Sequence, residues 1–299
     1  LQIAMTKLYP GNLVLSLSSG VMHHRLVDRI TSLNDVPREP LVPRRLGKNM
    51  CVPFGKILRG KVVPNTVTKT LHTDKVYEPD LESYTIEPFP YYSPLNSQIE
   101  TIRSFDRPVI LVDDLVHKAD RLRVLVPKLR ETGIPIKKVV VGVLSGYGRD
   151  LMQQLKVPVE SIYSMPKVRQ WFVESTLYPF IGGDTVRREE MKVAGLQPSI
   201  NMILPYATPR LSGCSREALV EFSACCIENS RDLFQVLEAE YRKMYAKNLT
   251  LSRLSEAVIL PLCPDKGSCM EYDENLAASV YLENDLETLW RMKEFLIKG

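Results

Sequence analysis

The chain has 299 residues, of which 44% are hydrophobic and 25% charged, a composition typical of a soluble globular protein with one large domain or two ordinary ones. The formal net charge of +4 is too small to indicate nucleic acid as a partner. The longest apolar runs, such as Val139 to Leu144, are too short to cross a bilayer, and no signal peptide is visible. We therefore expect a cytoplasmic protein that binds neither membrane nor nucleic acid.

The first residues, Leu1-Gln2-Ile3, carry no initiator Met, and the apolar pattern is already running there. The chain could be a processed protein or a piece excised from a longer one, and the apolar pattern favours the excised piece. Covalently linked domains would then be among its partners.

Two stretches of the first half read as irregular. The segment from Asp28 to Pro53 is rich in Pro, Arg and Asn, and the segment from Tyr77 to Pro94 is dense in Pro, Tyr and acidic residues. Successive prolines disfavour helix there. A long loop inside a compact domain is often functional, which makes the second stretch a candidate lid.

The centre of the chain predicts a strand, a helix and a second strand. Residues 108–112 form a short β-branched apolar run, Leu122 to Arg130 has apolar residues at helical spacing, and residues 137–144 form another apolar run. Such a βαβ unit implies parallel strands with a right-handed crossover.

Farther along the chain the pattern becomes mainly helical. Ile200 to Leu204 is one more strand candidate, Ser215 to Tyr245 is a long helix that Ser215 can cap, and residues 279–297 form the last helix. We expect an α/β fold with a mostly parallel central sheet of about five strands, flanked by helices. Residues 1–205 would form the α/β domain, and residues 206–299 a mainly helical extension that could pack on the same core.

The best candidate for a ligand site is the acid pair Asp113-Asp114, which follows the first predicted strand. Two carboxylates at a strand end can accept hydrogen bonds from the hydroxyl groups of a ligand. The loop after them, from His117 to Arg121, can turn its amides and a helix N-terminus toward a phosphate.

Four apolar residues, two acids, two apolar residues and a polar loop together resemble the signature of type I phosphoribosyltransferases. A second segment, Lys56 to Lys61, resembles the pyrophosphate loop of that family, in which a short strand ends in Arg-Gly before a helix, and Gly60 would let an anion approach the backbone. The resemblance implies a transferase site for phosphoribosyl pyrophosphate or a nucleotide. The catalytic acids Asp113 and Asp114 would hold the ribose hydroxyls and bind Mg²⁺. The residues that bind phosphate or pyrophosphate would be Arg59, Gly60, Lys61, His117, Lys118 and Arg121.

The phosphate loop departs from the family pattern. Where the family has Thr-Gly-x-Thr, this chain has Lys118-Ala119-Asp120-Arg121, so two hydroxyls and the glycine are replaced. Ala119 could block close backbone approach and Asp120 adds a repelling charge. Lys118 and Arg121, in contrast, can hold a phosphate through their side chains. The sequence leaves open whether the loop still supports turnover, only binds, or binds nothing.

Two further segments occupy places where this fold carries functional loops. Leu144 to Asp150 reads as a glycine-rich loop between a strand and a helix, and Tyr178 to Asp184 combines aromatic residues with a Gly pair. A plain turn is the alternative in both cases. The residues that could face a base are Tyr147, Arg149, Phe180 and Asp184.

The chain also looks like the C-terminal part of large bacterial proteins labelled as cytidylyltransferase-related. Their His-x-Gly-His motif is absent, because Met22 to Arg25 lacks the glycine, so we do not expect nucleotidyl transfer from this piece. Two functions therefore stand side by side. One is a phosphoribosyltransferase-like domain with a degenerate phosphate loop, and the other is an inactive sensing or scaffolding module beside a nucleotidyltransferase domain outside this chain.

Overall fold

The computed structural model describes residues 1–43, 45–89, 92–187, 197–209, 213–254, 259–261 and 272–298. The chain forms two compact units. We call Leu17–Asp74 with Ile86–Trp171 the parallel-sheet unit, and Leu1–Ser16, Lys75–Thr85 and Phe172–Gly299 the mixed-sheet unit. The expected domain boundary near residue 205 falls inside the mixed-sheet unit, and the division into residues 1–205 and 206–299 stays a prediction.

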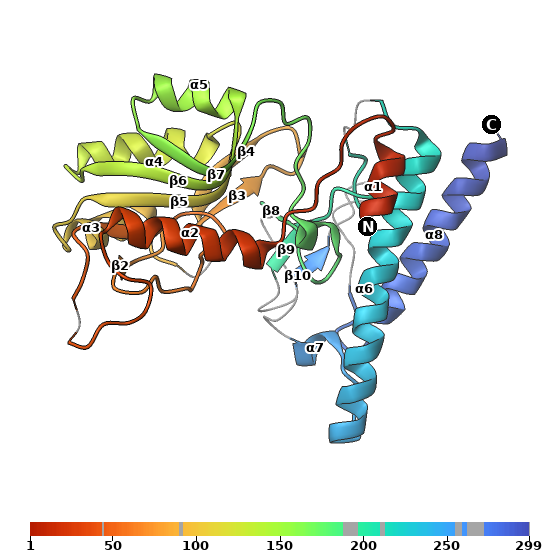
Figure 1. Ribbon diagram of the computed structural model, residues 1–299. Helices are drawn as coiled ribbons and strands as arrows, with labels where there is room; N and C mark the ends of the chain where they lie inside the picture. The colour runs from red at the N-terminus through yellow and green to blue at the C-terminus, as the bar shows by residue number, and fades with distance from the viewer. Residues whose placement is uncertain are drawn as a thin grey trace. The chain divides into compact units, whose positions relative to one another are not determined.

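The parallel-sheet unit is built on five strands in the order β2-β1-β5-β6-β7, and every neighbouring pair is parallel (Figure 1). Strand β5 is therefore the central strand. The strands are β1 (Met50–Pro53), β2 (Val67–Thr68), β5 (Val109–Val116), β6 (Ile136–Ser145) and β7 (Val159–Met165). This arrangement confirms the α/β class and the parallel sheet of about five strands.

Helices cover both faces of this sheet (Figure 1). Ile110 and Val112 of β5 pack in one apolar cluster with α2 (Ser19–Leu33). Val109 and Leu111 point the other way, as alternation along a strand requires, and pack with the helices of the opposite face. Those helices are α3 (Leu95–Arg103), α4 (Asp120–Glu131) and α5 (Gly146–Gln154).

The predicted strand–helix–strand unit is confirmed as β5, α4 and β6, with one change. Strand β5 continues to Val116, so the acid pair lies within the strand, toward its C-terminal end. The stretch from Asp28 to Pro53 is not irregular throughout, because α2 runs to Leu33 and β1 begins at Met50.

A second sheet was not expected from the sequence. Its order is β10-β9-β8-β3-β4, and it mixes parallel and antiparallel pairs. The predicted strand at residues 200–204 ends at Ile200. The strands are β3 (Thr73–Tyr77), β4 (Tyr84–Pro88), β8 (Asp184–Val186), β9 (Gln197–Ile200) and β10 (Ile259–Pro261).

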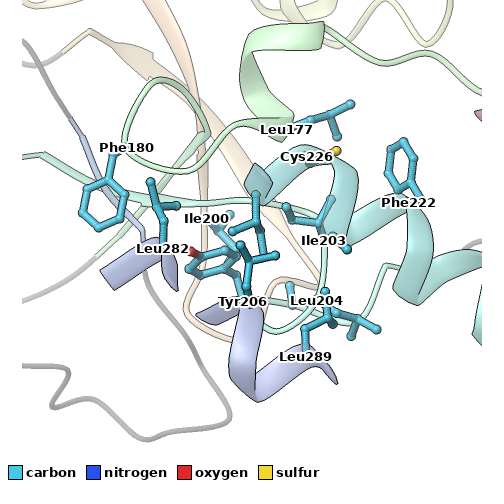
Figure 2. Close-up of a cluster of buried hydrophobic side chains, with 14 of the residues drawn as sticks. Leu177, Phe180, Ile200, Ile203, Leu204, Tyr206, Phe222, Cys226, Leu282 and Leu289 are labelled. Carbon is cyan, nitrogen blue, oxygen red and sulfur yellow. The ribbon is translucent and has the colours of Figure 1, made fainter. Parts of the chain in front are cut away.

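The helical C-terminal part is confirmed. Ser215 caps the long helix as predicted, since its Oγ accepts a hydrogen bond from the Ala218 amide at 3.1 Å. Figure 2 shows the apolar core of the mixed-sheet unit, where Phe180, Tyr206 and Phe222 are fully buried. No helix in the described ranges is long and apolar enough to cross a membrane. The remaining helices are α1 (Gln2–Leu8), the 3₁₀ turn η1 (Glu174–Leu177), α6 (Arg216–Tyr245), α7 (Leu251–Leu254) and α8 (Ala278–Lys298).

Candidate functional site

The two carboxyl groups of the acid pair lie next to each other, although consecutive residues of a regular strand point to opposite faces. The alternation slips at this point of β5. Val112 and Leu115, three positions apart, both pack on the α2 face, and the ladder to β6 pairs Asp113 and then Leu115 without a partner for Asp114. As a result the Asp114 carboxyl lies within hydrogen-bonding reach of Asp113.

The Asp113 side chain is almost fully buried, and a backbone amide donates a hydrogen bond to its carboxyl. Its Oδ1 accepts the Asp114 amide at 2.8 Å, and the Asp114 Oδ1 accepts the Leu115 amide at 2.9 Å. Burial raises the pKa of Asp113 well above its ordinary value, and the charge of Asp114 raises it further, while Arg121 acts in the opposite direction. A group held this way can either donate or accept a hydrogen bond, depending on the charge that a ligand brings.

Helix α4 opens beside the pair. Its first flanking residue, Ala119, is in the left-handed conformation with φ of +54°, and no side chain caps the helix. The residue that replaces the family's glycine therefore keeps the backbone conformation that glycine adopts most easily. The uncapped first-turn amides of α4 are the groups that bind anions in helix N-termini.

Arg121 joins the helix start to the acid pair. Its Nη1 lies 3.9 Å from the Asp113 Oδ2, and 22% of its side chain is exposed. Its Nε is buried and has no hydrogen-bond partner among the residues that the structure describes. A buried donor without an acceptor is uncommon in native proteins, so this atom has room for an acceptor that the described chain does not supply.

Arg59 approaches the pair from the turn after β1. Its Nη2 donates to the Thr73 carbonyl at 3.1 Å, and its guanidinium lies 4.8 Å from the centre of the Phe89 ring. Burial lowers the pKa of Arg59, Asp74 opposes that effect, and Arg121 adds to it. Its Nε is likewise buried without a partner in the described part of the chain.

The stretch from Tyr77 to Pro94 is only partly the irregular lid that the sequence predicts. Residues 84–88 form strand β4, so the expectation of an irregular chain is wrong there. Beyond the strand, Phe89 covers Arg59, and Tyr92 stacks on His72 with ring centres 3.7 Å apart. This end of the stretch therefore lies close to the charged groups around the acid pair. Pro90 and Tyr91 lie outside the described residues.

The two remaining candidates after β5 are His117 and Lys118, and only His117 has a hydrogen-bond partner among the described residues. The Nδ1 of His117 lies 2.8 Å from the Ser145 Oγ, which also accepts the Gly148 amide and caps α5. His117 is therefore tied to a helix cap. Lys118 is exposed, and its ammonium makes no hydrogen bond or ion pair within the described ranges.

The expected glycine-rich loop from Leu144 to Asp150 is not a loop, because β6 ends at Ser145 and α5 begins at Gly146. Ser145 supplies the reason: its side chain satisfies an amide of the first turn, so no linker is needed. Tyr147 is 53% exposed, and Arg149 donates to the Ser164 Oγ at 2.7 Å.

The pyrophosphate-loop candidate also differs from the family pattern. Residues 56–60 form turns, and no helix follows them, since the chain passes to β2. Gly60 has φ of +69°, a conformation that favours glycine, with open space around the position of a Cβ. Of the three candidates in this loop, Arg59 interacts electrostatically with Arg121 and Asp113, and Lys61 is exposed.

Two base-side candidates belong to the mixed-sheet unit. Phe180 is fully buried in its core, against the rings of Phe234 and Tyr272, and Asp184 begins strand β8. The packing gives Phe180 a structural role in that core.

Sequence reasoning missed several residues of the site, among them Gly55, His72, Asp74 and Phe89. Gly55, where a Cβ would clash with the Asp113 carboxyl, had a readable signal, because a glycine just beyond a strand that neighbours the acid strand can make room for a carboxylate. His72 and Asp74 lie at the start of β3, and Phe89 follows β4 within the predicted lid. Nothing in their local pattern singles out these three residues as neighbours of the acid pair.

Comparisons with known proteins add little to this geometry. No protein-family model and no curated protein matches the chain. Among solved structures, the chain is similar to a purine phosphoribosyltransferase from Pyrococcus horikoshii Ot3, at 12% identity and a TM-score of 0.28, over 58% of this chain and 90% of that one. Similarity at this level does not assign the chain to a family. The resemblance to cytidylyltransferase-related proteins gains no support.

Proposed function

We propose that the parallel-sheet unit binds a ribose phosphate, either phosphoribosyl pyrophosphate or a nucleotide, at the acid pair. The observation that carries the proposal is the pair of arginines at Asp113: Arg121 Nη1 lies 3.9 Å from the Asp113 Oδ2, and Arg59 interacts electrostatically with both Asp113 and Arg121. The Nε atoms of both arginines are buried and unpartnered in the described residues. A sugar phosphate carries hydroxyl donors for the acids and phosphoryl oxygens for the guanidinium groups.

The residues would share the work as follows. Asp113 and Asp114 accept hydrogen bonds from the ribose hydroxyls. Arg121 and the uncapped amides of α4 hold the 5′-phosphate, with Lys118 at the rim, and Arg59 holds a pyrophosphate or second phosphoryl group. If transfer occurs, these cations stabilise the departing pyrophosphate, and the acids stabilise a positively charged ribosyl centre.

Magnesium fits this site only as a partner of the ligand. The described residues hold no group of three or more metal-ligating side chains, and Asp113 with Asp114 supplies just two carboxyls. Mg²⁺ commonly keeps several waters and uses one or two carboxylates together with substrate phosphates. When bound, it would supply positive charge that neutralises phosphoryl oxygens.

The second candidate is a sensing or scaffolding module that binds without turnover, or not at all. Asp120 favours it, because this acid stands in the first turn of α4, where a bound phosphate would meet its charge. A test of binding and a test of turnover therefore separate three cases: enzyme, sensor and scaffold.

The binding test is titration calorimetry with ribose 5-phosphate and with phosphoribosyl pyrophosphate, each with Mg²⁺, on the whole chain and on the Asp113→Asn/Asp114→Asn variant. We expect saturable binding that the double substitution removes. Release of pyrophosphate from phosphoribosyl pyrophosphate then separates an enzyme from a sensor. Absence of binding by the unaltered chain at millimolar ligand contradicts the proposed site.

A further inference from the structure

The imidazole ring of His117 is held from the side of strand β6. His117 is in the loop between β5, which ends at Val116, and α4, which begins at Asp120. Its Nδ1 lies 2.8 Å from the Oγ of Ser145, the last residue of β6. The Tyr147 ring packs on it at an angle, with the ring centres 5.7 Å apart. One nitrogen of the ring therefore has a fixed partner.

A close approach of two backbones brings Ser145 to this ring. A Cβ on Gly148 would lie 2.2 Å from the Val116 carbonyl oxygen, so the first turn of α5 packs directly on the end of β5. In that turn the Gly148 amide donates a hydrogen bond to the Ser145 Oγ at 2.9 Å. The same oxygen that caps α5 thus faces the Nδ1 of His117.

The proton of the Ser145 hydroxyl decides which form the ring takes. Ser145 is only 1% exposed, and in the described part of the chain its Oγ has two partners, the Gly148 amide and the His117 Nδ1. Only the Nδ1 can accept a proton, and a buried donor is rarely left unsatisfied. The hydroxyl therefore donates to Nδ1, so the proton of the neutral ring is on Nε2.

The Nε2 of His117 is available to a ligand. It makes no hydrogen bond within the described ranges, and it is not a buried atom. Because it carries the ring proton, it can donate a hydrogen bond but cannot accept one. It therefore suits an acceptor such as a phosphoryl oxygen.

A serine beside a histidine is also the arrangement of an activated nucleophile. Ser145 is unsuited to that role, because its oxygen is buried and already accepts the Gly148 amide. The contact between Ser145 and His117 serves instead to orient the ring.

We propose that Ser145 is a positioning residue, which holds neutral His117 in the Nε2–H form so that Nε2 donates a hydrogen bond to the phosphate of the ligand. A ring protonated on Nδ1 would turn a lone pair toward the phosphate and repel its oxygens. The inference rests on the ribose phosphate proposed above as the ligand, but the place of the proton is measured without it.

Nuclear magnetic resonance gives the place of the proton from the nitrogen shifts of the ring. The protein is the full chain without ligand, at about pH 8.5, where an ordinary histidine is neutral. The matched variants are Ser145→Asn and Ser145→Asp, which have nearly the same shape and both cap helices. Asparagine keeps a donor for Nδ1 and should keep the Nε2–H form, whereas a carboxylate only accepts and should reverse it. An Nδ1–H ring in the unaltered chain, or an Nε2–H ring in the Ser145→Asp variant, overturns the proposal.

Substitution of His117 tests the same assignment and leaves the buried serine in place. Glutamine puts its amide near the position of Nε2, and asparagine puts its amide near that of Nδ1. We expect His117→Gln to keep most of the ribose 5-phosphate binding, and His117→Asn to weaken it by about tenfold or more. The control is His24→Asn, at an exposed histidine of α2, which should leave the affinity unchanged. Circular dichroism confirms that each variant folds.

The outcomes separate this inference from the proposed function. If the unaltered chain does not bind ribose 5-phosphate, both fail. If it binds, and His117→Asn binds equally well or His117→Gln loses as much as His117→Asn, then Nε2 does not contact the ligand. In that case the role given to Ser145 and His117 is overturned and the site at the acid pair stands.

Discussion

A Cβ atom on Gly55 would lie only 1.6 Å from the Oδ1 of Asp113. The carboxyl of Asp113 therefore occupies the space that any other residue at position 55 would fill. Gly55 is also the first residue after Phe54 in the turn that leads to Arg59. The missing side chain at Gly55 thus makes room for the buried Asp113 carboxyl, in the same turn that leads to Arg59.

The first prediction follows from this contact. Gly55→Ala should displace the Asp113 carboxyl, remove ribose 5-phosphate binding and destabilise the fold by about 1–3 kcal/mol, as overpacking commonly does. Calorimetry and urea unfolding measure the two effects. The control is Gly20→Ala in α2, where a new Cβ would meet nothing closer than the Ser18 Oγ at 3.7 Å. A Gly55→Ala protein with normal binding would show that Asp113 does not need this space.

The second prediction concerns the left-handed residue before α4. Ala119→Gly should stabilise the protein by about 1 kcal/mol, because the positive φ of +54° costs alanine more than glycine. Ala239→Gly on the exposed side of α6 should have the opposite effect, about 1 kcal/mol of destabilisation, since its backbone is helical. Thermal or urea unfolding of both variants gives the comparison. Destabilisation by Ala119→Gly would contradict the assigned conformation.

Local patterns were sufficient for the elements that bury a continuous apolar face. The β5–α4–β6 unit and the cap at Ser215 are readable because strand alternation, helical spacing and capping chemistry act over a few residues. The parallel pairing of β5 with β6 then follows the usual rule for a strand–helix–strand unit.

Two of the errors share a physical cause, which is pairing between distant segments. Strand β4 forms in a Pro-rich stretch because it belongs to a sheet with β3 and β8, and no local preference predicts that sheet. The proximity of the Asp113 and Asp114 carboxyls depends on a slip of alternation that two neighbouring strands share. The sequence therefore indicated the two acids and Arg59, and it could not indicate Phe89 as the residue that packs on Arg59.

A third prediction uses two carboxyl groups with opposite pKa shifts. The pKa of Asp113 is raised in the folded state, so its favourable contribution is complete below the unfolded pKa, near 4, and is lost as pH rises through the folded pKa. Asp113→Asn should therefore become more stable relative to the unaltered protein as pH rises from 4 toward 8. Chemical unfolding across that range measures the trend.

Glu160 provides the control for this pH dependence. Burial alone would raise the pKa of Glu160, but hydrogen bonds and charges from Lys138 and Arg29 lower it. Its contribution is present above the unfolded pKa and lost as pH falls, so Glu160→Gln should cost stability at neutral pH and less in acid. Parallel trends for the two variants would contradict the opposite shifts.

The last prediction separates a binding site from a scaffold. Arg121→Ala should weaken ribose 5-phosphate binding by about 1.5–3 kcal/mol, or roughly 10- to 150-fold, because a charge-assisted hydrogen bond in a largely buried place is lost. Lys118→Ala should have a smaller effect that shrinks with added salt, since exposed charges are screened over about 10 Å at 0.1 M ionic strength. The matched control is Arg123→Ala, an exposed arginine two residues farther along α4, whose removal should change affinity little. Titration of the three variants at two salt concentrations gives all the comparisons. Equal losses for Arg121→Ala and Arg123→Ala would mean that the ligand responds only to net charge, and no loss for either, with binding retained, would place the ligand away from the acid pair.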